Sequence, residues 1–402
     1  MTLDYITELL EKNDKKIVLL IMDGLGGLPM EEGGKTELET AKTPNMDRLA
    51  AEGALGRTIP VRPGVTPGSG PAHLSLFGYD PIEYKIGRGA LSALGIGMHL
   101  NKGDVAARGN FCTLDSDGKV TDRRAGRIAN ELALPVVEKL QSISIPGVKV
   151  EVRHVKEYRF TIVMRGEGLG HNILDTDPQE TGVLPHAVTA TDPDSEKAAS
   201  LFQQWVDEAC KVLADEPQAN GVLLRGFATH PGLKPFPEVF GVRSACIAVY
   251  PMYKGVSRLV GMDVIDFEGE YPKEEFAATA KIWDDYDFFF IHIKKTDSMG
   301  EDGNFDGKVH IIESVDEALP DLLALKPDVL MITGDHSTPA RMRSHSWHPV
   351  PFLMWAPTLG MQDEQTHFGE RACAKGNLGT FHATHTLPLG LAHAGKLIKF
   401  GA

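Results

Sequence analysis

The chain is poor in cysteine and contains no long uncharged apolar stretch. Its four cysteines among 402 residues, Cys112, Cys210, Cys246 and Cys373, are scattered without Cys-x-x-Cys spacing. This pattern indicates neither a disulfide framework nor a zinc knuckle. No apolar run is long enough to span a bilayer, and the first residues lack a basic stretch followed by an apolar segment. We therefore expect a cytoplasmic protein without a membrane partner.

The chain also lacks an excess of basic residues. It has 41 Lys and Arg against 55 Asp and Glu, which gives a formal net charge of −14. This balance argues against a general nucleic-acid binder or a binder of anionic membranes. It leaves room for a locally basic pocket that holds a small anionic substrate. The composition sets no oligomeric state.

Continuous apolar runs recur along the chain and alternate with helical patterns. Such runs are typical of strands buried on both faces of a parallel sheet. The helical patterns lie near residues 273–282 and 305–323. Strands that alternate with helices predict a mostly parallel α/β sheet. The predicted strands are 16–23, 245–250, 287–293, 328–333 and 350–356.

Residues 82–245 differ in character from the rest of the chain. They combine glycine-rich loops with a predicted strand pair at 148–152 and 158–164 and a long helix at 194–214. We interpret residues 82–245 as a smaller α+β domain inserted into a core. That core is formed by residues 1–81 and 246–402.

Ser69 lies in a stretch, residues 64–78, where prolines and glycines surround it on both sides. These residues disfavour regular structure, so we predict Ser69 on a tight, exposed turn. Pro71 suits the first position of a following helix. The unpaired N–H groups at a helix start favour negative charge, which suits a nucleophile that carries a phosphoryl group. A plain surface turn is the alternative interpretation.

Carboxylates and imidazoles follow several of the predicted strands. In α/β sheets, ligands collect at the carboxyl ends of the strands, and these side chains are typical ligands of divalent cations. For any one of them alone, a structural hydrogen-bonding role is the alternative, and we expect His292 and His73 to be structural. The residues at the strand ends are Asp23, His292, Asp297, Asp335 and His336, and His345 lies just before the predicted strand at 350–356.

Several basic residues are candidates for binding a small anion. Arg123, Arg124 and Arg127 lie close together in Thr-Asp-Arg-Arg-Ala-Gly-Arg, at a density that would allow bidentate binding of phosphate or carboxylate. Arg225 ends a predicted strand, and Lys254 lies in Tyr-Lys-Gly. A solvated surface charge is the alternative for each of them.

Four spaced motifs resemble those of the archaeal-type, 2,3-bisphosphoglycerate-independent phosphoglycerate mutases. The motifs are Met-Asp-Gly, Thr-Pro-Gly-Ser-Gly-Pro-Ala-His, Gly-Asn-Phe with Asp-Arg-Arg-Ala-Gly-Arg, and Gly-Asp-His-Ser-Thr-Pro with Pro-Val-Pro-Phe. They occur in the family's order along nearly the whole chain. The resemblance places the chain in the alkaline phosphatase superfamily. It implies a three-layer αβα sandwich, an inserted substrate-binding domain and a site for two divalent metal ions.

The resemblance also implies roles for individual residues. Ser69 would accept the phosphoryl group, and the basic residues Arg123, Arg124, Arg127, Arg225 and Lys254 look like the family's binders of the substrate anion. Glu301 stands where the family has a histidine, and an oxygen ligand shifts preference from Zn²⁺ towards Mn²⁺ or Mg²⁺, with Co²⁺ and Zn²⁺ as alternatives. The implied ligands are Asp23, Ser69, Asp335 and His336 for one metal, and Asp297, Glu301 and His345 for the other.

The implied activity is that of an isomerase. It would interconvert 3-phosphoglycerate and 2-phosphoglycerate through a phosphoserine, in a closed cleft that excludes water. One alternative is another phosphoryl-transfer enzyme of the superfamily: a phosphatase, a phosphonate hydrolase or a phosphosugar mutase. A second alternative is a non-catalytic metal-binding relative, for which the glutamate at position 301 is the hint.

Overall fold

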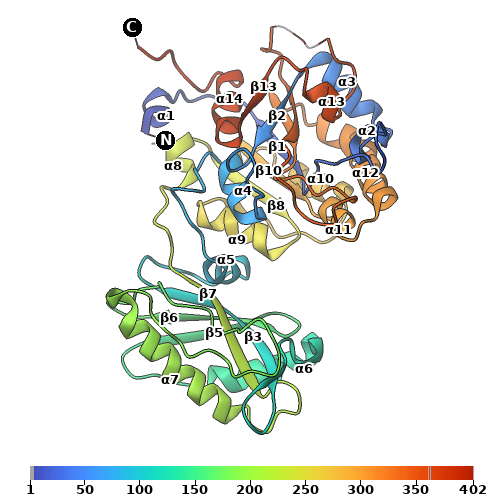
Figure 1. Ribbon diagram of the computed structural model, residues 1–402. Helices are drawn as coiled ribbons and strands as arrows, with labels where there is room; N and C mark the ends of the chain where they lie inside the picture. Colours follow the sequence, from blue (N-terminus) through green and yellow to red (C-terminus); the bar gives the residue numbers. More distant parts are fainter. Residues whose placement is uncertain (1–3, 361, 363, 402) are drawn as a thin grey trace. The chain divides into compact units, whose positions relative to one another are not determined.

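The computed structural model describes residues 4–360, 362 and 364–401, and the chain divides into two compact units (Figure 1). Unit 2 is the continuous segment Ile86–Leu233, and unit 1 contains the residues on either side of it. Unit 1 therefore includes residues 234–245, which the sequence analysis assigned to the insert. The reason is packing: Phe236 contacts Phe77 and Phe288, with ring centroids 6.2 and 5.0 Å apart.

Unit 1 is built on an eight-stranded sheet with β1 (Ile17–Met22) near its centre. On either side of β1 lie β10 (Phe288–Ile293) and β11 (Val329–Thr333), both parallel to it. The pairs of β12 with β11 and with β2 are antiparallel. The order is β13-β2-β12-β11-β1-β10-β8-β9, with β2 at Ala54–Ile59, β8 at Ser244–Ala248, β9 at Asp263–Val264, β12 at Val350–Trp355 and β13 at Gly379–His382.

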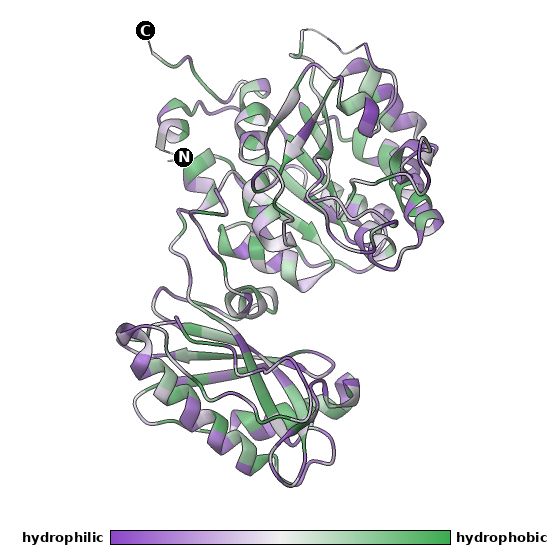
Figure 2. Ribbon diagram, in the orientation of Figure 1, coloured by the Kyte–Doolittle hydropathy of each residue, from purple (hydrophilic) through white to green (hydrophobic). Residues whose placement is uncertain are grey.

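Helices cover both faces of this sheet. One face packs on α3 (Pro44–Glu52), α10 (Pro272–Lys281) and α12 (Phe305–Leu323), whose apolar residues form one core cluster with β1, β10 and β11. The other face packs on α4 (Ser69–Leu76) and α9 (Pro251–Leu259). The ring centroids of Phe77, at the end of α4, and Phe290 of β10 are 4.9 Å apart. Figure 2 shows the strands as hydrophobic and the outer sides of the helices as more hydrophilic. The predicted αβα architecture with a mostly parallel sheet is confirmed.

Shorter helices complete unit 1. Some of them pack on the sheet: Leu38 of α2 and Cys373 of α13 belong to the core cluster, and Gly390 of α14 lies against Met331 of β11. None of the helices in the part of the chain that the structure describes combines the length and apolarity needed to cross a membrane. The shorter helices are α1 (Asp4–Leu9), α2 (Glu37–Thr40), α8 (Phe236–Phe240), α11 (Lys295–Glu301), α13 (Glu370–Cys373), η3 (Ala383–His385) and α14 (Thr386–His393).

The start of α4 differs from the prediction. The helix begins at Ser69 itself, with Gly68 as its N-cap, and Ser69 is half-buried. Pro71 is therefore the third helical residue and not the first. Proline is tolerated there because the first N–H groups of a helix have no intrahelical acceptor.

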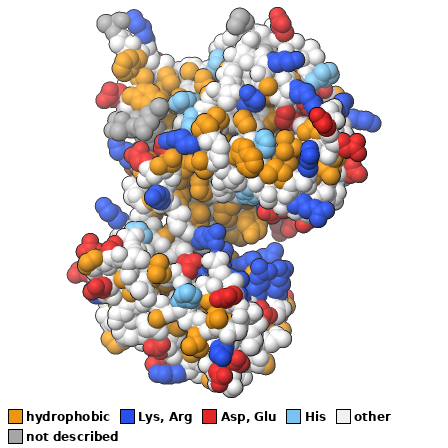
Figure 3. Space-filling model, viewed as in Figure 1, with side chains coloured by type: hydrophobic (Ala, Val, Ile, Leu, Met, Phe, Trp, Pro, Cys, Tyr) orange, Lys and Arg blue, Asp and Glu red, His pale blue; other side chains and the backbone are white. Residues whose placement is uncertain are grey.

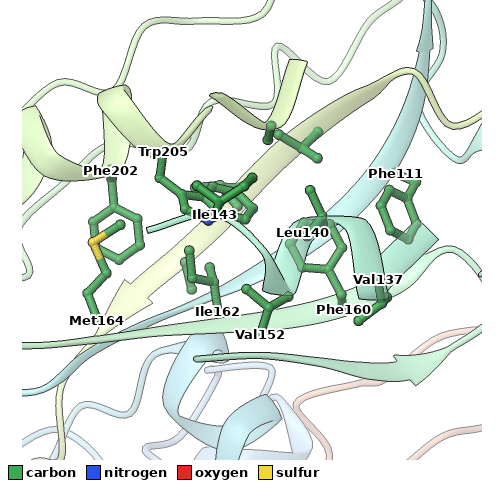
Figure 4. Close-up of a cluster of buried hydrophobic side chains, with 14 of the residues drawn as sticks. Phe111, Val137, Leu140, Ile143, Val152, Phe160, Ile162, Met164, Phe202 and Trp205 are labelled. Carbon is green, nitrogen blue, oxygen red and sulfur yellow. The ribbon is translucent and has the colours of Figure 1, made fainter. Parts of the chain in front are cut away.

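Unit 2 is an antiparallel sheet with helices on both faces. Its core lies between the sheet and two helices, where Phe160 contacts Phe111 and Trp205 with ring centroids 4.9 and 6.0 Å apart (Figure 4). The strands run β4-β3-β6-β5, and β7 also pairs with β3. They are β3 (Val105–Leu114), β4 (Val120–Asp122), β5 (Lys149–Lys156), β6 (Arg159–Arg165) and β7 (Gly221–Ala228). The helices are α5 (Arg88–Gly95), η1 (Ala125–Arg127), α6 (Asn130–Gln141), η2 (Pro193–Ser195) and α7 (Glu196–Val212).

Glu370, the first residue of α13, is a buried carboxyl group that holds the loop after β1. One oxygen, Oε1, accepts a hydrogen bond of 2.8 Å from the Gly27 N–H, and the other accepts one from the Thr36 hydroxyl. Burial raises the pKa of Glu370 from 4.5 to about 7. The folded state therefore binds this proton more tightly than the unfolded chain does.

We expect Glu370→Gln to change how stability depends on pH. Because the folded pKa is raised, the wild-type side chain stabilises the fold fully below pH 4.5, and this contribution is lost as the pH rises to about 7. The amide does not ionise, so the free energy of unfolding of the variant relative to wild type should increase by up to about 3 kcal/mol between pH 5 and pH 8. Urea unfolding at both pH values measures this difference. The exposed Glu317→Gln is the control, and a difference that does not vary with pH would contradict the expectation.

Candidate metal centre beside Ser69

The three central strands of unit 1 bring their following residues to one edge of the sheet. Asp23 directly follows β1, Asp335 and His336 follow β11, and Asp297 lies in the first turn of α11 after β10. Because β10, β1 and β11 are parallel neighbours, their carboxyl ends are adjacent. Residues far apart in the sequence thus form one cluster.

One group of potential ligands surrounds His336. Its Nε2 lies 3.1 Å from Asp335 Oδ2, 3.4 Å from Asp23 Oδ1 and 3.2 Å from Ser69 Oγ. The two aspartates and His336 are fully buried, and α4 presents the Ser69 hydroxyl from its first position. The ligand atoms of Asp23, Asp335 and His336 are close enough together to hold one metal ion.

A second group adjoins the first. His345 Nε2 lies 3.6 Å from Asp297 Oδ1 and 3.8 Å from Glu301 Oε1. The rings of His345 and His336 stack with centroids 3.7 Å apart, so the two groups meet at His336. Glu301, at the end of α11, has a side chain that is 55% exposed. The side chains of His345 and Asp297 are less exposed, at 21% and 3%.

Hydrogen bonds set the tautomers of both imidazoles. The Thr338 hydroxyl donates its one hydrogen to Asp297 Oδ1 at 2.7 Å, so it accepts from His336 Nδ1 at 2.9 Å. His345 Nδ1 donates to the Pro67 carbonyl at 2.9 Å. Both Nδ1 atoms therefore carry the hydrogen, and both Nε2 lone pairs face the carboxylates. This is the second-shell arrangement that orients histidine ligands of metals.

The first group is electrostatically incomplete without a cation. Asp23 Oδ1 and Asp335 Oδ2 are buried and have no hydrogen-bond donor among the described residues. Burial, with the charge of Asp335, raises the pKa of Asp23 well above its usual range, and burial raises that of Asp335 to about 7. Burial also lowers the pKa of His336, which keeps the ring neutral. A divalent cation would satisfy these lone pairs together, so the donor set fits a metal.

Lys294 is a member of the site that the sequence analysis missed. Its Nζ lies 3.0 Å from Asp23 Oδ2 and 2.5 Å from Asp297 Oδ2. Burial opposes its charge, but the two carboxylates raise the pKa of Lys294. Lys294 therefore binds the Oδ2 atom of each aspartate. The Oδ1 atoms are left facing His336 and His345. The sequence signal that could have identified Lys294 is its position between the end of a predicted strand and Asp297.

Lys308, in α12, is a second lysine that the sequence analysis missed. Its side chain is fully buried and donates to the carbonyls of Gly24 at 2.8 Å, Gly26 at 3.1 Å and Thr338 at 2.9 Å. These carbonyls belong to the loops that follow Asp23 and His336. Lys308 thus joins the two loops that follow Asp23 and His336. It does so without contacting a ligand side chain.

The histidines expected to be structural lie next to this cluster. His73 donates through Nδ1 to the carbonyl of Ser69 at 2.8 Å, and burial lowers its pKa to about 4. The ring of His292 stacks on Tyr253 at 3.6 Å, and the Tyr253 hydroxyl donates to Asp23. Both histidines are fully buried.

The five basic residues expected to bind the substrate are divided between the two units. Arg123 makes two hydrogen bonds of 2.8 Å to Asp177. Arg124 and Arg127 are exposed, and their side chains make no hydrogen bond or ion pair with any described residue. These three and Arg225 belong to unit 2, whereas Lys254 belongs to unit 1 and lies 3.6 Å from Asp266. Arg225 lies 3.3 Å from Asp175 and 3.2 Å from Asp177.

The fold and this site define an α/β protein whose parallel sheet carries a candidate centre for two cations beside a helix-N-terminal serine. A family model described as 2,3-bisphosphoglycerate-independent phosphoglycerate mutase matches residues 50–219. A protein of Thermus thermophilus named as a probable member is 54% identical over 401 residues, which cover 99% of this chain and 98% of the relative. A probable member from Aquifex aeolicus is 52% identical and covers 100% of both chains.

Solved structures agree with the sequence relatives. A protein from Pyrococcus horikoshii matches with a TM-score of 0.84 and 33% identity, over 97% of this chain and 100% of that one. The cofactor-independent phosphoglycerate mutase from Thermoplasma acidophilum matches with a TM-score of 0.76 and 30% identity, over 95% and 100%. The chain belongs to the 2,3-bisphosphoglycerate-independent phosphoglycerate mutase family, a family of isomerases. The resemblance stated from the sequence is confirmed.

We expect Lys308→Met to weaken both the fold and the metal centre. The substitution leaves three carbonyl groups without their charged donor, so the free energy of unfolding should fall by about 3 kcal/mol. Because the loops bearing Asp23 and His336 lose their common anchor, the affinity for Mn²⁺ should fall about 10- to 100-fold. Denaturant unfolding and calorimetric titration with Mn²⁺ measure the two effects. The exposed Lys281→Met is the control, and unchanged Mn²⁺ affinity in a folded Lys308→Met protein would contradict a positioning role.

Proposed function

We propose that this protein interconverts 3-phosphoglycerate and 2-phosphoglycerate, with Ser69 as the transient phosphoryl acceptor. The observation that carries the proposal is the position of the Ser69 hydroxyl, 3.2 Å from His336 Nε2, where the two groups of ligands meet. Relatives along nearly the full length are named for this mutase activity.

Two divalent cations would complete the site, Mn²⁺ or Mg²⁺ by preference. Bound there, they would supply the positive charge that lowers the pKa of the serine hydroxyl and stabilises phosphoryl oxygens. Glu301 adds an oxygen in place of a nitrogen, which favours these harder ions over Zn²⁺. The first ion would be held by Asp23, Ser69, Asp335 and His336, and the second by Asp297, Glu301 and His345.

The chain's own groups then act on the phosphoryl group. Ser69 Oγ attacks the phosphorus of 3-phosphoglycerate, and the bond between phosphorus and the substrate's 3-oxygen breaks. The serine proton is transferred to that oxygen. Glycerate then reorients, its 2-oxygen attacks the phosphoserine, and the proton of the 2-hydroxyl returns to Ser69. The N–H groups of Ser69 and Gly70 at the start of α4 have no intrahelical acceptor and favour the anionic group. The buried ammonium of Lys294 adds a fixed positive charge next to Asp23.

The proposal includes a role for the inserted segment. The sequence pattern places this segment at residues 82–245, and the compact unit 2 contains residues 86–233. Its arginines would bind the substrate's anionic groups, and exclusion of water would protect the phosphoserine from hydrolysis. Arg123, Arg124, Arg127 and Arg225 are the candidates from this segment. Lys254 is the candidate from unit 1.

We expect Ser69→Ala to lose mutase activity by at least about 10⁴-fold while keeping its fold, because the phosphoryl acceptor is removed. A coupled assay of 3-phosphoglycerate conversion, without 2,3-bisphosphoglycerate and on metal-stripped protein refilled with Mn²⁺, measures this loss. Ser75→Ala is the matched control because Ser75 is a buried serine on the same helix. Substantial activity of Ser69→Ala would refute the assignment of the acceptor. Free phosphate as the wild-type product would indicate a hydrolase instead.

We expect Glu301→His to change the metal preference. Replacing an oxygen ligand by a nitrogen should raise the affinity for Zn²⁺ relative to Mg²⁺ by about tenfold, or about 1.4 kcal/mol. Titration of the metal-stripped protein with each ion measures the ratio directly, and the refilled enzyme is assayed in parallel. Asp302→His places a histidine at the next, exposed position and serves as the control. An unchanged ratio would show that residue 301 is not a ligand.

A further inference from the structure

Tyr253 is a buried residue of the metal centre to which the proposed function gives no role. It is the third residue of α9, and its side chain is inaccessible to solvent. Its ring stacks on His292 of β10 with centroids 3.6 Å apart, and it lies 4.8 Å from the ring of His73 on α4. Because both neighbours are also fully buried, the ring is held in one orientation. This orientation directs the hydroxyl to Asp23 Oδ2, to which it donates a hydrogen bond.

Lys294 contacts the same oxygen of Asp23. It directly follows β10, and its Nζ lies 3.0 Å from Asp23 Oδ2. A carboxylate oxygen has two lone pairs, so Tyr253 and Lys294 together engage both of those on Oδ2. The other oxygen, Oδ1, is buried and has no donor among the described residues. Asp23 therefore keeps one oxygen for a cation, and the protein itself occupies the other.

The protein also engages one oxygen of each of the other two aspartates in this way. Lys294 Nζ lies 2.5 Å from Asp297 Oδ2, whereas Asp297 Oδ1 faces His345. Asp335 Oδ1 accepts a hydrogen bond of 3.0 Å from the Gly24 N–H, and its Oδ2 has no donor in the part of the chain that the structure describes. All three carboxylates thus have an oxygen that is turned to a donor and away from the histidines.

The number of oxygens that a site offers distinguishes divalent cations of different size. Ca²⁺ takes roughly six to eight oxygen ligands at about 2.3–2.6 Å and often binds both oxygens of a carboxylate, whereas Mg²⁺ keeps to an octahedron at about 2.0–2.1 Å. Surface charge attracts such ions alike, and Figure 3 shows acidic and basic side chains interspersed over the visible face of unit 1. Selection among these ions therefore depends on the buried ligands.

We propose that Tyr253 and Lys294 exclude Ca²⁺ from the metal centre by occupying the Oδ2 atoms of Asp23 and Asp297. With these atoms occupied, each aspartate offers a single oxygen, and the histidines add nitrogens, which Ca²⁺ does not favour. Mn²⁺ and Mg²⁺ need fewer ligands and are accepted. The inference rests on the part of the proposed function that assigns two divalent cations to this centre. Tyr253 is a positioning residue, because it acts on the cation through Asp23.

Tyr253→Phe tests the proposal because it removes one donor from Asp23 Oδ2 without changing the charge. Ca²⁺ is added to the full-length, Mn²⁺-loaded protein, and released Mn²⁺ is followed by its electron paramagnetic resonance signal. Since Asp23 can then bind Ca²⁺ through both oxygens, half of the bound Mn²⁺ should leave at about tenfold lower Ca²⁺ than in wild type. Tyr79→Phe is the matched control, because Tyr79 is also fully buried and its hydroxyl donates to the Lys234 carbonyl at 2.7 Å.

Lys294→Met extends the test to both groups of ligands. Because Lys294 holds an oxygen of Asp23 and one of Asp297, Ca²⁺ should displace both Mn²⁺ ions from this variant more readily. Loss of the ammonium charge raises the affinity for every divalent cation. The ratio of the Ca²⁺ and Mn²⁺ dissociation constants, measured by calorimetry on metal-stripped protein, removes this common effect. Lys295→Met, which removes the neighbouring lysine 3.6 Å from Glu270, is the control.

A purely structural role would give a different result. If Tyr253 only supported the fold, Tyr253→Phe would lower the Tm and weaken Ca²⁺ and Mn²⁺ binding by the same factor. An unchanged ratio of the two dissociation constants in Tyr253→Phe therefore overturns the proposal, whatever the change in Tm. If Tyr253→Phe does not fold, an unchanged ratio in Lys294→Met overturns it.

The proposed function can fail separately, because the ratio is measured without substrate. A wild-type protein that lacks mutase activity but prefers Mn²⁺ to Ca²⁺ through Tyr253 would refute the function and retain the selection. Mutase activity with the same ratio in wild type and in both variants would retain the function and refute the selection. A wild-type protein that binds no divalent cation would refute both.

Discussion

The ammonium group of Lys308 is the interaction on which the arrangement of unit 1 depends most. It lies in a fully buried position and donates to three carbonyls from the loops after β1 and β11. Without this ammonium the Thr338 carbonyl would lose its donor, and the carbonyls of Gly24 and Gly26 would keep only the N–H of Thr338. Asp23 and His336, at the starts of these loops, owe their fixed positions to a residue that touches neither side chain. A buried positive charge behind the site also offsets part of its carboxylate charge.

Hydrogen bonds orient the two groups of candidate ligands in the same way. In each, an imidazole has its Nδ1 hydrogen fixed by a neighbouring oxygen, from Thr338 or from Pro67, so that its Nε2 lone pair faces carboxylates. Lys294 holds the far oxygens of Asp23 and Asp297. The candidate ligands are therefore oriented by the protein's own hydrogen bonds, which would limit the reorganisation that metal binding requires.

Much of the fold of unit 1 and of its candidate site could be predicted from the sequence, because these features depend on residues that are close together in the chain. Apolar runs identified β1, β10 and β11, and the polar residues that follow them identified Asp23, Asp297 and Asp335 as neighbours. The remainder depends on non-local pairing. Lys308 occupies one position of an otherwise ordinary amphipathic helix, where a lysine usually reaches solvent. Tyr253 meets Asp23 only because α9 packs on the sheet, and the engagement of Arg123 with Asp177 is equally invisible in a linear motif.

The insertion of unit 2 has a consequence for how the chain folds during synthesis. The central strand β1 is made early, but both of its sheet partners, β10 and β11, emerge only after the whole of residues 86–233. Unit 2 is continuous and can assemble as it leaves the ribosome, whereas unit 1 must wait with an apolar strand unpaired. The apolar strand β1 is therefore exposed to aggregation while unit 2 is made, until β10 and β11 can pair with it.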